Sequence, residues 1–85
     1  MDPQTRDKIA FLESHGFRYI FDRDVFFSVD SKKCISLEYA KDHELAELQE
    51  LVASPNETGR WLFHFNEQPS RTLQAQLSQV LDEAA

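Results

Sequence analysis

The sequence has one cysteine, two glycines and no long hydrophobic run. The single cysteine, Cys34, excludes an internal disulfide. The chain also has no second cysteine and no two histidines at ligand spacing, so it lacks the sequence pattern of a zinc site. No stretch approaches the ~18–20 consecutive apolar residues that a transmembrane helix needs. These absences predict a protein without a membrane segment, a metal ion or another cofactor.

Basic residues are also few. Lys and Arg number 9 against 15 Asp and Glu, which gives a formal net charge of −6. Because nucleic acids and anionic membranes attract surfaces of the opposite sign, we expect neither of them as a direct partner. The first residues contain no apolar core of signal-peptide length, which predicts a cytoplasmic protein.

Aromatic residues are plentiful: the chain has seven Phe, two Tyr and one Trp. A small domain needs them, because it buries only roughly 60–65% of the surface that its unfolded chain exposes. Each aromatic side chain can bury about 150–250 Å². The length of 85 residues and the lack of a Pro- or Gly-rich linker predict one domain over residues 1–85.

Three segments have the signals of helices. Residues 2–14 begin with Asp-Pro, which suits a helix N-terminus, and are followed by Gly16, which can close a helix in the left-handed conformation. Residues 42–53 would begin at Asp42 as the capping residue. Residues 69–84 show the strongest amphipathic pattern, with apolar residues at helical spacing: Leu73, Leu77, Val80, Leu81 and Ala84.

Four segments alternate large apolar and polar residues, the period of a half-buried strand. Their large side chains are Phe17, Tyr19 and Phe21; Val25, Phe27 and Val29; Ile35, Leu37 and Tyr39; and Trp61, Phe63 and Phe65. Because residues directly opposite each other in a hairpin share a face, we predict Tyr19 opposite Phe27 and Val29 opposite Ile35. The turns would then lie at residues 22–24 and 31–33.

The predicted fold is α+β, with two layers and the element order α-β-β-β-α-β-α. The first three strands form an antiparallel meander. A helical crossover then reaches the fourth strand, which makes that strand parallel to the third. The helices lie mainly on one face of the sheet. The sequence leaves open whether the fourth strand lies beside the third strand or beside the first.

The outer face of this sheet is the main candidate for function. With the fourth strand beside the first, and Ile20 opposite Phe26, it would carry an apolar patch with a charged rim of Arg18, Arg60 and Glu38. Such patches mark interaction surfaces. We predict that this patch binds a partner protein or a second copy of the chain, through Ile20, Phe26, Leu62, His64, Arg18 and Arg60. The chain would then be an adaptor, regulator or inhibitor and not an enzyme.

A second hypothesis rests on the acidic residues of the second predicted helix. Asp42, Glu44, Glu47 and Glu50 would present an acidic face to a basic protein, as an inhibitor or a nucleic-acid mimic does.

A third hypothesis is a small enzyme or ligand-binding protein with a site near His64. Cys34 could act as a nucleophile if the neighbouring lysines, Lys32 and Lys33, lowered its pKa. No nucleophile signature surrounds Cys34, and the aspartates near it suit turns better than acid–base chemistry. We therefore expect no catalytic residue.

Overall fold

The computed structural model describes residues 2–84 as a four-stranded sheet with four helices. The elements are α1 (Pro3–Ser14), β1 (Arg18–Ile20), β2 (Val25–Ser28), β3 (Lys33–Ser36), α2 (Leu37–Asp42), α3 (Leu45–Ala53), β4 (Leu62–His64) and α4 (Arg71–Ala84). The strand order is β1-β2-β3-β4, with β1, β2 and β3 antiparallel and β4 parallel to β3. This confirms the predicted α+β class, the meander and the parallel fourth strand, which lies beside the third.

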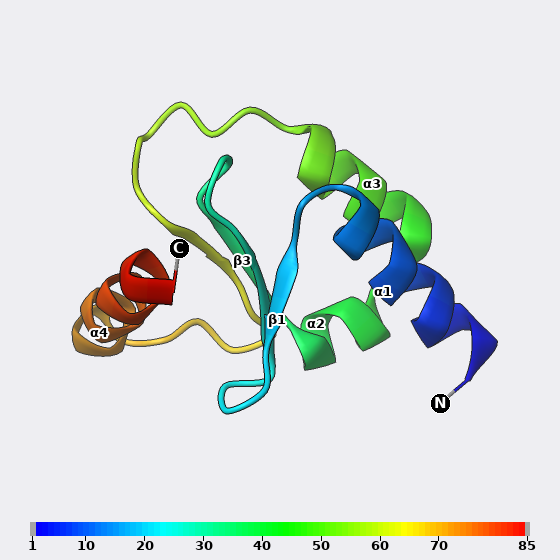
Figure 1. Cartoon of the computed structure of the whole chain (residues 1–85), viewed down its shortest axis with the longest axis horizontal. Helices are drawn as coiled ribbons and strands as arrows, with labels where there is room; N and C mark the ends of the chain where they lie inside the picture. The colour runs from blue at the N-terminus through cyan, green and yellow to red at the C-terminus, as the bar shows by residue number, and fades with distance from the viewer. Residues whose placement is uncertain (1, 85) are drawn as a thin grey trace.

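The sheet separates two hydrophobic cores. Figure 1 shows it edge-on, with α1, α2 and α3 on one side and α4 on the other. The three-helix core consists of Leu12, Phe17, Phe26, Ile35, Ala40 and Leu48. The α4 core consists of Val25, Phe27, Cys34, Trp61, Phe63, Leu77 and Leu81. Three of the four helices thus share one face, and α4 covers the opposite face.

Helix α1 begins and ends where the sequence predicts. Asp2 is the N-cap, and its carboxylate accepts a hydrogen bond from the backbone N–H of Thr5 at 2.8 Å. At the other end Gly16 adopts a φ of +85°, and the N–H of Phe17 bonds the carbonyl of Leu12 at 3.0 Å. This is a Schellman closure, which folds the buried Phe17 back onto the last turn.

The predicted strand register is wrong. Ile20 lies opposite Val25, and Phe26 lies opposite Ile35. The first hairpin turns over residues 21–24, one residue more than predicted. Phe26 points away from α4, and it is buried because α1, α2 and α3 cover the face of the sheet that was expected to be open (Figure 1). All four residues of β2 are buried, so apolar alternation could not distinguish its faces.

The boundary between the third strand and the second helix also differs from prediction. Strand β3 ends at Ser36, and α2 begins at Leu37, where an alternating strand was expected. Ser36 is the N-cap, since its hydroxyl accepts a hydrogen bond from the N–H of Tyr39 at 3.1 Å. Asp42 ends α2 and does not cap α3. The crossover to β4 therefore contains two short helices instead of one.

Helix α4 follows its predicted pattern. The hydroxyl of Ser70 accepts a hydrogen bond from the N–H of Leu73 at 3.2 Å, just before the helix begins. Leu77 and Leu81 are buried in the α4 core, whereas Leu73 is 39% exposed. None of the helices among the described residues has the length and apolar character needed to span a bilayer.

Candidate functional site

The apolar residues of the predicted patch lie in three different places. Phe26 is only 1% exposed, beneath the helices of the three-helix core. Ile20 is half-buried and packs against the α4 core, on the opposite face. Leu62 and His64 lie in β4, at the other edge of the sheet from β1. The predicted patch required β4 beside β1 and Ile20 opposite Phe26, and neither arrangement is present.

The two arginines of the predicted rim are exposed but far apart in the fold. Arg18 lies in β1, and Arg60 lies in the loop before β4. Each arginine borders a different hollow of the surface. A role of Arg18 and Arg60 in partner binding stays a prediction, and the two residues would act at two separate surfaces.

Three exposed apolar side chains lie in β1 or in the turns beside β2: Tyr19 in β1, Phe21 in the turn before β2 and Val29 in the turn after it. Phe21 is 81% exposed, Tyr19 is 42% exposed and Val29 is 41% exposed. The Tyr19 ring packs on Phe26 with ring centroids 5.0 Å apart, and its hydroxyl donates a hydrogen bond to Asp24. That hydrogen bond raises the pKa of Tyr19, with smaller contributions from burial and from the Asp24 charge. Tyr19 is therefore a protonated, oriented aromatic on the surface.

Strand β1 has a free edge, because its only strand neighbour among residues 2–84 is β2. One hollow of about 260 Å³ is lined by Gly16, Arg18, Phe27, Val29 and Asp30. A second hollow of about 210 Å³ is lined by Ile9, Glu13, Tyr19, Phe26 and Leu37. Phe26 and Phe27 point to opposite faces of the sheet, so the hollows flank the strand on both sides. We call this region the β1 edge surface; it faces the viewer in Figure 1.

His64 belongs to a group of rings beneath α2. Its ring centroid lies 6.0 Å from that of Tyr39, which stacks on His43 at 3.7 Å. The Nε2 atom of His64 is buried and has no hydrogen-bond partner among the described residues. Burial, and then the positive charge of Lys33, lower the pKa of His64 below its ordinary value. The arrangement therefore favours a neutral imidazole.

The lowered pKa of His64 predicts a loss of stability in acid. In the unfolded chain the pKa of His64 is ordinary. Below about pH 6.5 the unfolded chain therefore binds more protons at His64 than the folded chain does. The stability contributed by neutral His64 is thus present above the unfolded pKa and is lost as the pH falls towards the lowered folded pKa. We expect the midpoint of thermal unfolding to fall less between about pH 7 and pH 5 in His64→Gln than in the wild type. The same change at the exposed His15 is the control, and equal slopes in all three proteins would contradict the prediction.

Cys34 is fully buried in the α4 core. Burial raises the pKa of its thiol to about 12, the opposite of the lowering expected from neighbouring lysines. A thiol of this kind carries almost no thiolate near neutral pH, so it is a poor nucleophile. Cys34 thus acts as a small core side chain.

The four acidic residues of the second hypothesis are exposed but do not lie on one helix. Asp42 ends α2 and accepts a hydrogen bond from Asn66 at 2.7 Å. Glu44 precedes α3, and Glu47 lies 3.9 Å from the Nε2 atom of His43. No group of three His, Cys, Asp or Glu side chains within residues 2–84 could hold a metal ion.

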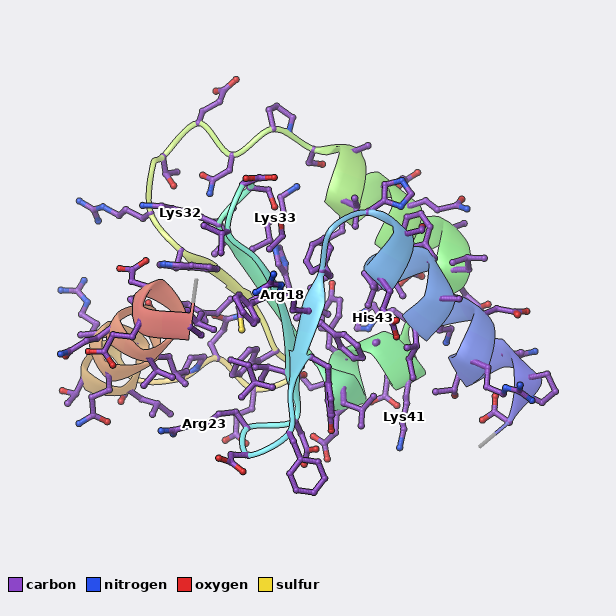
Figure 2. All side chains as sticks on the ribbon, in the orientation of Figure 1. Arg18, Arg23, Lys32, Lys33, Lys41 and His43 are labelled. Atoms are coloured by element: carbon purple, nitrogen blue, oxygen red, sulfur yellow. The ribbon has the colours of Figure 1, made fainter. Side chains whose placement is uncertain are left out.

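Sequence reasoning missed the role of Lys33, which follows the β2–β3 turn and is only 1% exposed. Its Nζ donates hydrogen bonds to the carbonyls of Leu51 at 2.5 Å, Val52 at 3.2 Å and Ser54. These carbonyls belong to the C-terminal end of α3, where helices have unpaired acceptors. Figure 2 shows Lys33 on the side of the β2–β3 hairpin nearer α3, and Lys32 on the side nearer α4. Nothing in the sequence distinguishes these two adjacent lysines.

Comparisons with protein-family models, with curated proteins and with solved structures found no match to this chain.

Proposed function

We propose that the protein is a non-enzymatic interaction module that binds an extended segment of a partner protein along the β1 edge surface. The observation that carries this proposal is the free edge of β1, with a hollow beside it on each face of the sheet. In strand addition, the main chain of a peptide pairs with an open edge, and its alternate side chains enter pockets on the two faces. The β1 edge surface offers both features.

The chemistry of the surface supports a partner with apolar side chains at alternating positions. Interfaces are enriched in aromatic residues, and Tyr19 and Phe21 are the exposed aromatics here. The hollow beside Tyr19 is mainly apolar, whereas the other hollow includes Arg18 and Asp30. Because β1 has only three residues, its main chain can form few hydrogen bonds, and the side chains must supply much of the affinity. We place this function in the cytoplasm, a setting that suits the single thiol of Cys34.

A peptide selection tests the proposal. Random 12-residue peptides displayed on phage would be selected on the wild-type protein and then titrated against the double variant Phe21→Ser, Val29→Ser. We expect peptides with alternating apolar residues that lose about tenfold or more in affinity on the double variant, since truncating a central interface side chain costs about 1–2 kcal/mol. Amide signals of residues 18–20 should shift in the NMR spectrum on binding.

Leu73 provides the matched control. It is the remaining large apolar side chain exposed among the described residues, and it lies on α4. Leu73→Ser should leave the affinity of the selected peptides unchanged. Peptides that bind the double variant as well as the wild type, or that shift amides outside β1, would contradict the proposal.

The dependence of the affinity on salt concentration distinguishes this function from binding through the acidic residues. Binding through the acidic residues, which are Asp42, Glu44, Glu47 and Glu50, should weaken steeply between low and moderate ionic strength. Binding through an apolar edge should persist. A self-associating protein would give a third outcome, with a concentration-dependent mass and line broadening at β1. That result would identify a second copy as the occupant of the edge and would contradict a separate partner.

A further inference from the structure

A second concave surface lies on the α4 side of the molecule, away from the β1 edge surface. It is an open groove of about 580 Å³ between α4, β4 and the β2–β3 turn. Its volume falls within the ~300–1,000 Å³ typical of small-molecule sites. The side chains that line it include Lys32, Arg60, Trp61, Arg71, Gln74 and Ser78. The groove therefore combines residues from three separate parts of the chain.

The lining has a charge opposite to that of the whole chain. Lys32, Arg60 and Arg71 contribute three basic groups, and no Asp or Glu lines the groove, although the net charge is −6. Within residues 2–84 none of the three has a carboxylate within 4.0 Å, since the one ion pair found there joins His43 and Glu47. The Nζ atom of Lys32 reaches only the carbonyl of Gly59, at 3.4 Å. A concave surface with cations of this kind focuses a positive potential and attracts anions.

The end of α4 adds to this potential. Arg71 is the first residue of this 14-residue helix, so the positive end of the helix dipole lies at the groove. Gln74 and Ser78 follow one turn apart on the same side, and both are uncharged. Gln74 donates to the carbonyl of Pro69 at 2.9 Å, and Ser78 donates to the carbonyl of Gln74 at 2.8 Å. This side of α4 thus supplies polar groups without the carboxylates that would repel an anion.

The floor of the groove is aromatic. Trp61 is 8% exposed, and its Nε1 donates a hydrogen bond to Asp82 at 2.8 Å. That hydrogen bond fixes the indole ring and engages the carboxylate of Asp82, which does not line the groove. A rigid aromatic surface beside cations suits a ligand that has both an anionic group and a flat or apolar part.

We propose that this groove binds a small organic phosphate. The phosphate lies among Lys32, Arg60 and Arg71, whose charged donors form the short hydrogen bonds that phosphate oxygens accept. The organic part lies over the small part of Trp61 that borders the groove and along the polar side of α4. This site is independent of the β1 edge surface, so one can fail without the other.

Calorimetry and NMR test the site with three probes: ADP, inorganic pyrophosphate and adenosine. Trp61 is the only tryptophan of the chain, so its indole N–H gives one assigned signal that reports on the groove. We expect ADP to bind and to shift this signal, pyrophosphate to bind more weakly, and adenosine to bind least. In the double variant Arg60→Gln, Arg71→Gln we expect the affinity for ADP to fall by about tenfold or more, because hydrogen bonds to charged groups are lost.

The matched control removes two other exposed arginines, as Arg6→Gln, Arg23→Gln, and so changes the net charge equally. This control should retain the affinity for ADP. Three results would overturn the proposal: no shift of the Trp61 signal with any probe at millimolar concentration, an equal loss in the control, or binding of long polyanions without binding of ADP. Because all four arginines are exposed, we expect each double variant to fold, and its thermal unfolding would verify this.

Discussion

Replacing Lys33 with methionine is expected to lower the free energy of unfolding by about 2–4 kcal/mol, because the change leaves partly buried carbonyls without their donor, and each such loss costs about 1–3 kcal/mol. Methionine retains most of the apolar stem, so the effect isolates the ammonium group. That group donates to three carbonyls at the end of α3 and lies at the negative end of the helix dipole. Burial lowers the pKa of Lys33, and these acceptors oppose that cost.

Urea unfolding followed by circular dichroism would measure this loss. The control is Lys41→Met, the same change at an exposed lysine of α2, which should cost no more than about 0.5 kcal/mol. A Lys33→Met variant as stable as the wild type would show that desolvation of the buried cation cancels its hydrogen bonds, as occurs for some buried ion pairs.

Replacing Phe26 with alanine is expected to cost about 3–5 kcal/mol, the usual range for a buried phenylalanine. Phe26 is 1% exposed in the three-helix core and contacts the Tyr19 ring. Since small domains have total stabilities of about 5–15 kcal/mol, this loss should remove a large share of the stability of the domain and lower its melting temperature. Thermal and urea unfolding would measure the change.

Phe21 is the matched control for this experiment, because the same substitution there removes a side chain that is 81% exposed. Phe21→Ala should change stability by less than about 0.5 kcal/mol. If the two variants were equally stable, Phe26 would lie on an open surface, as the sequence pattern predicted. The comparison therefore tests whether Phe26 lies in a core or on an open surface.

The two ends of α1 and the start of α4 were predictable because their signals are local. The capping of α1 by Asp2 and its closure at Gly16 depend on residues within one turn, and so does the start of α4 near Ser70. The amphipathic pattern of α4 also identified its buried leucines, Leu77 and Leu81. The meander and the parallel crossover followed from element order and chain geometry.

The faces of the strands could not be predicted in this way. Alternation assigns faces only when one face is polar, and β2 is buried on both. The candidate patch depended on that assignment, so Phe26 was expected on an outer surface and is in a core. The start of α2 was hidden because Leu37 and Tyr39 continue the apolar alternation of β3, although Ser36 is a typical capping residue.

The position of β2 and β3 between two cores has a consequence for cooperativity. Neighbouring residues of β2 belong to different cores, since Phe26 faces three helices and Phe27 faces α4. Each core is small, and both cores pack on β2 and β3. If these strands lose their structure on one side of the sheet, the core on the other side loses its packing surface as well. Damage on one side of the sheet should therefore be transmitted to the other through the shared backbone, and the whole chain should unfold in one all-or-none transition rather than core by core.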